Sequence, residues 1–460
     1  MGLHAKCVVD DILYSDAVKY LESFINYEKI DCYDYRQSIN LDRMKRLLAI
    51  LGNPHSGIKT LHIAGSKGKG STAAMVASIL EHAGFVTGLY TSPHLIDFSE
   101  RIRINNTNIG KHEISELVNR IRPAIDEMQS GYGERPSFFE VYTAIAFMYF
   151  SGISRYDHTK DSNRKVDFMV LETGLGGRLD ATNVVMSLVS GITPISYEHT
   201  DKLGVTLTEI ANEKCAIIKE DSICVSSVQD KEVLEVIERV SAEKRARLFL
   251  VGREVMYKQT RCDTRGQVFD LKGISGEYKN MEVKLLGAHQ VLNAAQAVGI
   301  VESLKFYDIC IKEECIREGL LSAYWPGRLE IINRNPFMVL DGAHNVASAK
   351  VLADAVRKIF DYKKLILVLG ISKDKDIPGV CGVLSAIADE IVITKASLSR
   401  AAEPRDIEMH MGSKPCLMTG SVKEALEIAR SKAGISDFIL ITGSLFVVGE
   451  AKAICQNESN

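Results

Sequence analysis

The sequence predicts an α/β protein built on two parallel sheets. The larger unit is P-loop-type and carries a phosphate-binding loop, and the smaller unit is Rossmann-like. Short apolar runs alternate with stretches of helical periodicity along most of the chain, which is typical of parallel strands joined by helices. One of these apolar runs ends in a glycine-rich loop. The length of 460 residues exceeds what one hydrophobic core supports, so we expect two or three domains.

The glycine-rich loop is the strongest local signal. Leu61–Ala64 predicts a buried strand, and the apolar spacing along Ser71–Gly84 predicts a helix. Between them lies Gly65-Ser-Lys-Gly-Lys-Gly70, whose glycines let backbone N–H groups face a phosphate at a helix N-terminus. We expect Lys69 to reach the terminal phosphates, with the Ser71 or Thr72 hydroxyl near a phosphate-bound Mg²⁺. The spacing departs from the usual P-loop pattern, and the alternative is a plain glycine turn.

Composition excludes several classes of protein. The net charge of −3 provides no basic field, so we do not expect nucleic acid as a partner. No apolar run is long enough to span a bilayer, and the first residues do not resemble a signal segment. The ten cysteines include no C-x-x-C pair, which favours reduced thiols over zinc or disulfides. We therefore expect a cytoplasmic protein.

The rest of the chain follows the same alternation. Residues 11–52 predict helices, 154–165 a charged surface loop, and 247–286 short antiparallel strands. Ser137 is a plausible N-cap for the apolar helix that follows it. The best domain boundary is Tyr324-Trp-Pro-Gly-Arg328, because a Pro-Gly pair precedes a fresh series of strands and helices. We therefore expect one domain over residues 1–324 and another over 325–460.

Polar residues gather directly after apolar strands, where open parallel sheets bind their ligands. Glu172 follows one predicted strand, at the place where an acid often holds Mg²⁺ opposite a phosphate loop. His199 follows another, and Ser92 a third. Each also has a structural interpretation, as a turn cap for Glu172 and Ser92 or as a structural histidine for His199. Lys214 by itself reads as a solvated helix lysine.

The combined motifs resemble the folylpolyglutamate synthase and dihydrofolate synthase family, within the Mur ligase superfamily of ATP-dependent amide ligases. They run in family order from about residue 60 to residue 445. The matching segments are His62-Ile-Ala-Gly-Ser-Lys-Gly-Lys-Gly-Ser71, Thr91-Ser-Pro-His94, Glu100-Arg-Ile-Arg103, Glu172-Thr-Gly-Leu-Gly-Gly-Arg-Leu-Asp-Ala-Thr-Asn183, His199-Thr-Asp-x-Leu-Gly204, Glu213-Lys214, His289-Gln-x-x-Asn293, Trp325-Pro-Gly-Arg328, Asp341-Gly-Ala-His-Asn345 and Thr442-Gly-Ser444.

This resemblance implies a reaction in which ATP converts a pterin-linked carboxylate into an acyl phosphate, and the amine of glutamate then displaces phosphate. It implies catalytic roles for Lys69, Lys214 and His344, with Lys214 as a candidate for carbamylation. It implies ATP contacts from Gly65, Ser66, Lys67, Gly68, Lys69, Gly70, Ser71, Asn293 (beside Gln290), Arg328 and Asp341. It implies two Mg²⁺ sites involving Ser92, Glu172 and His199, a monovalent cation (K⁺), and substrate contacts from Arg103, His344 and Ser444.

Three positions depart from the family pattern. Lys67 stands where many relatives have Asn, Tyr197-Glu198 precedes His199 where Leu-Asp is usual, and Cys215-Ala216 follows Lys214 where Ala-Gly is common. The alternatives are a muropeptide ligase and a P-loop ATPase that hydrolyses ATP without ligation. The sequence leaves open whether the enzyme acts on reduced folates alone or also on dihydropteroate. The resemblance implies a monomer.

Overall fold

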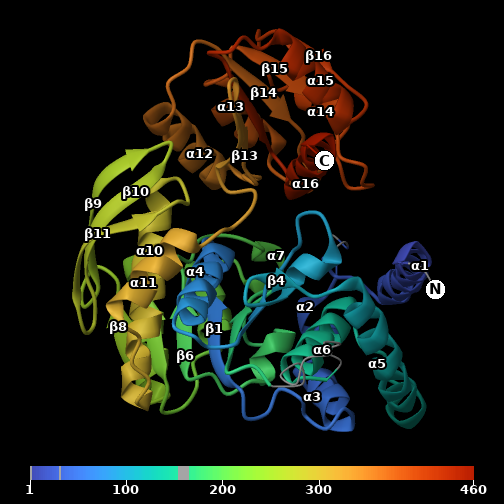
Figure 1. The fold of residues 1–460 in the computed structure, drawn as a ribbon, viewed down its shortest axis with the longest axis vertical. Helices are drawn as coiled ribbons and strands as arrows, with labels where there is room; N and C mark the ends of the chain where they lie inside the picture. Colours follow the sequence, from blue (N-terminus) through green and yellow to red (C-terminus); the bar gives the residue numbers. More distant parts are fainter. Residues whose placement is uncertain (1–2, 29, 31–32, 154–164, 460) are drawn as a thin grey trace.

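The computed structural model describes residues 3–28, 30, 33–153 and 165–459. The strands of these residues form three sheets, shown from one side in Figure 1. The largest has eight strands in the order β4-β3-β2-β5-β1-β6-β7-β8, the second has six in the order β12-β13-β17-β14-β15-β16, and the third has three in the order β11-β10-β9. The predicted loop over residues 154–165 lies almost entirely outside the described residues.

The large sheet is parallel around its centre. β1 (Lys59–Ala64) pairs in parallel with β5 (Phe168–Glu172) on one side and β6 (Val189–Ile192) on the other. Parallel pairing continues to β7 and β8, whereas β3 and β4 are antiparallel at the opposite edge. The remaining strands are β2 (Thr87–Tyr90), β3 (Ile102–Ile104), β4 (Thr107–Asn108), β7 (Ile223–Ser226) and β8 (Arg247–Leu250).

Helices cover both faces of this sheet. Successive side chains of a strand point to opposite faces, so each strand contributes to two cores. On β5, Phe168 and Val170 face one hydrophobic core, whereas Met169 and Leu171 face another. The first core is completed by α4 (Lys69–His82), α10 (Ala288–Ser303) and α11 (Glu313–Ser322). The second is completed by α1 (Leu3–Glu22), α3 (Leu41–Ile50), α5 (Lys111–Tyr132) and α6 (Phe138–Phe150). Ser137 caps α6 through a reciprocal capping box with Glu140, as predicted.

The remaining helices of the larger body are α2 (Tyr35–Ser38), α7 (Thr200–Leu203), α8 (Leu207–Cys215), α9 (Lys231–Glu243) and the 3₁₀ turns η1 (Phe98–Arg101), η2 (Ala181–Val184) and η3 (Leu304–Tyr307). Of these, α7, α8 and α9 pack in a further hydrophobic core against β1, β6 and β7. The small antiparallel sheet is made of β9 (Met256–Asp263), β10 (Gly266–Lys272) and β11 (Glu277–Val283). The prediction of antiparallel strands over 247–286 is therefore right for these three, and wrong for β8, which joins the large sheet in parallel.

The six-stranded sheet forms the upper body in Figure 1 and has helices on both faces. Its strands are β12 (Glu330–Arg334), β13 (Phe337–Leu340), β14 (Leu365–Leu369), β15 (Glu390–Ile393), β16 (Cys416–Met418) and β17 (Phe438–Thr442). Its helices are α12 (Val346–Ile359), α13 (Ile377–Ser385), α14 (Pro404–Glu408), α15 (Val422–Lys432) and α16 (Leu445–Ser459). Only β12 runs antiparallel. The expected fold class is thus confirmed.

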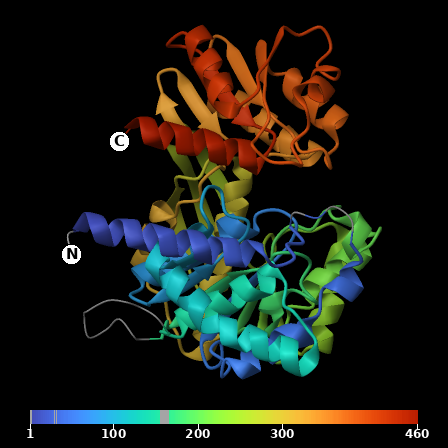
Figure 2. The ribbon, with the colours of Figure 1, turned by 90° about the vertical axis from the view of Figure 1, so that its right-hand side faces the viewer.

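The two parallel sheets are joined through residues 323–329, between α11 and β12. Figure 2 shows α1 below and α16 above the gap between the two bodies. The loop that follows β2 reaches across to the smaller body. Its Leu95 packs against the hydrophobic core of that body. Within the described residues, no helix is both long enough and apolar enough to cross a membrane.

Candidate active site

A cavity of about 400 Å³ lies where the carboxyl ends of the two parallel sheets meet. The predicted site residues that line it are Ser66, Lys67, Gly68, Lys69, Gly70, Ser71, Ser92, Arg103, Glu172, His199, Asn293, Arg328, Asp341 and His344. Three predicted residues do not line it: Gly65, Lys214 and Ser444. Most of the polar residues predicted to gather after strand ends therefore do line one cavity. The three exceptions lie behind its wall or beside it.

The glycine-rich loop leaves no room for larger residues at two positions. Gly68 adopts a left-handed backbone conformation with φ of 88°, and a Cβ there would lie 2.4 Å from Oδ1 of Asn293. A Cβ on Gly70 would lie 2.5 Å from the indole of Trp325. The loop is therefore enclosed by α10 on one side and by the segment between the sheets on the other. Lys69 begins α4, so the loop leads directly into a helix N-terminus.

The predicted adenine-side residue is tied to the loop. The Asn293 amide donates to Gln290 at 2.9 Å, and Gln290 in turn donates to the Ser71 hydroxyl at 3.4 Å. Both amides are buried in α10. His289, on the same helix, also lines the cavity, and burial is the main cause that lowers its pKa to about 4. His289 belongs to one of the family motifs, but we could not assign it a role from the sequence alone.

Glu172 ends β5 with a buried carboxylate that has few partners. Within the described residues it accepts one hydrogen bond, from the backbone N–H of Ser92 at 3.2 Å. Burial raises the pKa of Glu172, while Lys69 and the Ser92 hydrogen bond oppose that shift. A buried carboxylate is costly without a cation. The Ser92 hydroxyl and this carboxylate are oxygen donors of the kind that Mg²⁺ prefers, so the residues present fit that ion.

The described residues hold no group of three or more His, Cys, Asp or Glu side chains arranged to bind a metal by themselves. An ion here would therefore need ligands beyond such side chains, such as a hydroxyl or phosphate oxygens. His199 also lines the cavity, at the N-cap of α7 with φ of 48°. Burial is the main cause that lowers the pKa of His199 to about 4, so its imidazole is neutral and able to act as a ligand.

Lys214 lies behind the loop and makes two hydrogen bonds. Its ammonium donates to the carbonyl of Gly65 at 2.8 Å and to Glu198 at 2.8 Å. Burial is the main cause that lowers the pKa of Lys214 to about 8, against the opposing charge of Glu198. For Glu198 burial favours a higher pKa, but Lys214, Lys69 and Lys67 together lower it to about 2. From the sequence, Glu198 was only a departure from the family pattern. Its central position among three lysines could not be predicted.

The smaller sheet contributes Asp341 and His344. The Asp341 carboxylate accepts the backbone N–H groups of Leu329 and Ala343, both at 2.9 Å. Burial raises the pKa of Asp341, and the nearby Arg328 opposes this. His344 places Nδ1 2.8 Å from the carbonyl of Gly342. A carbonyl only accepts, so Nδ1 carries the proton, and burial lowers the pKa of His344 to about 4.

Ser444 does not line this cavity. Its hydroxyl accepts the backbone N–H of Phe446 at 3.2 Å, at the start of α16. It is buried, and its neighbour Leu445 lines the cavity instead.

Trp325 also lines the cavity, although the sequence alone did not indicate a separate role for it. Its indole lies between Gly70 and Arg103, whose guanidinium is 5.4 Å from the ring centroid.

Comparison with known proteins places the chain among the Mur-type ligases. Residues 152–301 match the Mur ligase middle domain, and residues 327–445 match the glutamate ligase domain of Mur ligases. The chain belongs to the family of folylpolyglutamate and dihydrofolate synthases. It is 37% identical over 416 residues to the dihydrofolate synthase/folylpolyglutamate synthase of Bacillus subtilis, covering 90% of this chain and 94% of that protein.

Two further relatives support the same family. The folylpolyglutamate synthase of Lacticaseibacillus casei is 30% identical over 448 residues, covering 95% of this chain and 98% of that protein. The structure of Mycobacterium tuberculosis folylpolyglutamate synthase complexed with ADP superposes with a TM-score of 0.86 at 30% identity, covering 97% of this chain and 99% of that one. Fold and sequence therefore agree over nearly the full length.

Proposed function

We propose that the protein is an ATP-dependent ligase that adds L-glutamate to a reduced folate through an acyl phosphate. One observation carries this proposal: a single cavity holds a phosphate loop, a nearly unpartnered buried acid at Glu172, and residues of a second sheet. A loop with a lysine binds polyphosphate, and the second sheet supplies a wall against water. Membership of the family supplies the substrate class.

In this proposal, separate groups of residues bind the phosphates, the metal ion and the rest of the nucleotide. The N–H groups of the loop and the ammonium of Lys69 hold the ATP phosphates and neutralise charge as the phosphoryl group moves to the substrate carboxylate. Ser92, Glu172 and His199 would hold Mg²⁺, which supplies charge neutralisation at the transferring phosphate. Asn293 and Gln290 lie on the adenine side, and Arg328 and Asp341 approach the nucleotide from the smaller domain.

The glutamate side is assigned to the smaller domain. His344 keeps Nε2 as an acceptor, because Nδ1 donates to Gly342. A neutral acceptor suits the attacking amine, which has to lose a proton as the amide bond forms. Ser444 supports this wall indirectly, through the first turn of α16. We assign residues 1–324 to the ATP-binding domain and 325–460 to the glutamate ligase domain, and the sheet memberships support that division.

Carbamylation of Lys214 is part of the proposal. Addition of CO₂ to the amine needs its neutral form, and a pKa of about 8 makes that form accessible near neutral pH. The carbamate would place an anion beside the loop, where Glu198 now binds the ammonium. Mass spectrometry of the intact protein, with and without bicarbonate, should detect the mass of one added CO₂. A Lys214→Met variant that keeps full activity would contradict a catalytic role.

The remaining expectations also stay proposals. They are a monomer, stimulation by K⁺, a cytosolic location, and use of dihydropteroate as a second acceptor. The eight described cysteines are all free thiols, which suits a reducing compartment. Activity should fall when K⁺ is replaced by a bulky organic cation, and light scattering should report a single chain.

The test is incorporation of radiolabelled glutamate by purified protein with ATP, Mg²⁺ and K⁺. Tetrahydrofolate and dihydropteroate are offered separately. We expect incorporation with tetrahydrofolate, and incorporation with both shows a bifunctional enzyme. A UDP-linked muropeptide serves as the third acceptor and should give none. Hydrolysis of ATP that is independent of glutamate and acceptor, without any incorporation, would contradict the ligase proposal.

A further inference from the structure

Two buried arginines, two positions apart, have opposite surroundings. Arg101 is 2% exposed, and its fork binds both carboxylate oxygens of Glu28 at 2.8 and 2.7 Å. Its Nε donates to Nδ1 of His94 at 2.9 Å. Arg103 is 7% exposed, yet its one hydrogen bond within the described residues runs from Nε to the carbonyl of Glu100 at 3.1 Å. Arg101 is therefore a paired structural charge, whereas Arg103 has no anionic partner among the described residues.

A buried cation without an anion is expensive, so the missing partner calls for an explanation. No carboxylate of the described chain lies within ion-pair distance of Arg103. The positive charge is partly offset by the face of Trp325, 5.4 Å away. Burial lowers the pKa of Arg103, with Glu100 and Tyr324 opposing, which agrees with an incompletely compensated charge. The two Nη groups of the guanidinium therefore remain as donors for an outside anion.

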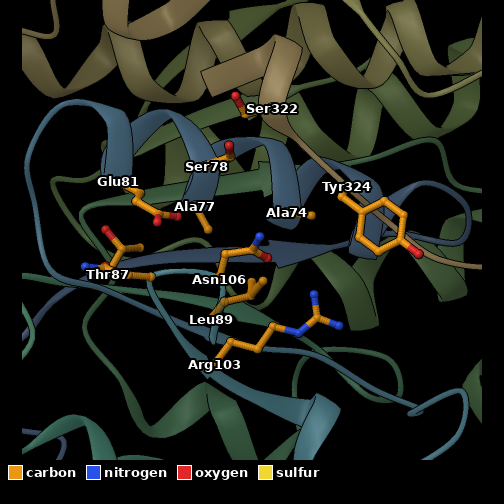
Figure 3. A pocket seen from close by; sticks show the side chains of 11 residues that line it. Ala74, Ala77, Ser78, Glu81, Thr87, Leu89, Arg103, Asn106, Ser322 and Tyr324 are labelled. Atoms are coloured by element: carbon orange, nitrogen blue, oxygen red, sulfur yellow. Dashed lines mark hydrogen bonds between the residues drawn. The ribbon is translucent and has the colours of Figure 1, made fainter. Parts of the chain in front are cut away.

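The position of Arg103 shows where that anion would lie. The residue lines the main cavity and also a smaller one beside it, shown in Figure 3 with Tyr324 and Asn106. Arg103 comes from β3 and its side chain extends toward Tyr324 (Figure 3). The indole of Trp325 packs on Gly70 and on Arg103. The guanidinium is thus separated from the phosphate loop by one aromatic ring.

We propose that Arg103 binds a substrate carboxylate that does not react. The planar fork of an arginine matches a carboxylate in a bidentate arrangement. The intervening indole separates this carboxylate from the phosphate loop, so it differs from the one that receives the phosphoryl group. Two sources share this chemistry: the α-carboxylate of the folyl glutamate and a carboxylate of the incoming glutamate. Arg103 would then select acidic substrates, an inference that rests on the proposed function.

The experiment compares Arg103→Gln and Arg103→Lys with the wild type in steady-state ligation. Loss of a charge-assisted pair should raise the KM of the bound substrate about 10- to 100-fold, with a smaller increase for Arg103→Lys, which keeps the charge but loses the fork. A rise in the KM of tetrahydrofolate alone assigns the folyl α-carboxylate. A rise in the KM of glutamate alone assigns the amino-acid substrate.

A substrate lacking the carboxylate supplies the matching half of the test. If the folyl α-carboxylate is bound, amidating it should slow the wild type and leave Arg103→Gln with little further loss. Amidated glutamate analogues serve the same purpose for the other source. Arg120→Gln is the control, because Arg120 is an exposed helix arginine paired with Glu116. It should change neither KM.

Three results would overturn the inference: unchanged KM values for both substrates, a rise in the KM of ATP alone, or equal losses with and without the carboxylate. Thermal unfolding of Arg103→Gln separates a folding defect from a binding defect. If its midpoint falls, the substrate-amide comparison still decides, because a general defect lowers activity on both substrates equally. Wild-type ligation in the same assay tests the proposed function independently.

Discussion

The carboxyl edges of the two parallel sheets border one cavity, but their buried acids are held differently. Glu172, on the large sheet, accepts one backbone hydrogen bond at 3.2 Å. Asp341, on the smaller sheet, accepts two at 2.9 Å each. Burial raises both pKa values. The difference teaches that the large-sheet edge is prepared for outside cations, whereas the small-sheet edge is satisfied by its own backbone and serves to shape and close the site.

Removing the cation of the phosphate loop should have the largest effect. Lys69→Met should lower kcat about 100- to 1000-fold, because a preorganised charge at the transferring phosphate disappears. Steady-state ligation measures this. Lys231→Met is the control, since the Lys231 side chain is 91% exposed on α9, and it should behave as the wild type. A Lys69→Met enzyme within threefold of the wild type (a range of about 0.7 kcal/mol in barrier) would contradict the assignment of this loop.

The two acids give the direct test of the comparison. Glu172→Gln should lower kcat about 100-fold and weaken the dependence on Mg²⁺, because the charge of the ligand is lost. Asp341→Asn should cost only about 10-fold, since the amide oxygen still accepts one backbone N–H while the other is lost. Activity across a Mg²⁺ titration measures both. If Asp341→Asn alone changes the Mg²⁺ requirement, the two edges have been assigned the wrong way round.

A methyl group in the loop should have a moderate effect. Gly68→Ala places a Cβ against Asn293 at 2.4 Å and imposes a left-handed backbone on alanine. We expect the KM of ATP to rise about 10-fold, corresponding to about 1.4 kcal/mol. Gly382→Ala, in α13, is the matched control, because nothing lies within 4 Å of its Cβ. An equal change in both variants would show that general backbone stiffening is the cause.

The last prediction concerns stability against acid rather than catalysis. His289 has its pKa lowered from 6.5 to about 4, chiefly by burial. The unfolded chain therefore binds a proton that the folded chain refuses between these values, so stability falls as pH drops from about 6.5 toward 4. His289→Gln should remove up to about 3 kcal/mol of this loss. Urea unfolding at several pH values measures it, and an unchanged pH slope would contradict the burial argument.

The sequence identified most of the cavity wall because strand ends and glycine loops are local signals. Lys69, Glu172 and His199 each follow an apolar run, and the structure brings them to one cavity. Lys214 could not be placed in this way, because its partner Gly65 is 149 positions away in the chain. The isolation of Arg103 was equally hidden, since a missing partner leaves no pattern in a sequence. β8 was misjudged because its short apolar run precedes a truly antiparallel sheet.

Transfer of an oxygen isotope tests the central claim most directly. Tetrahydrofolate labelled with heavy oxygen in its reacting carboxylate is converted with ATP and glutamate, and the released phosphate is weighed by mass spectrometry. If the large-sheet edge builds an acyl phosphate that the small-sheet edge delivers to glutamate, one labelled oxygen enters each phosphate released. Two results would contradict this account. One is amide formation accompanied by unlabelled phosphate, and the other is phosphate release at the same rate with and without glutamate.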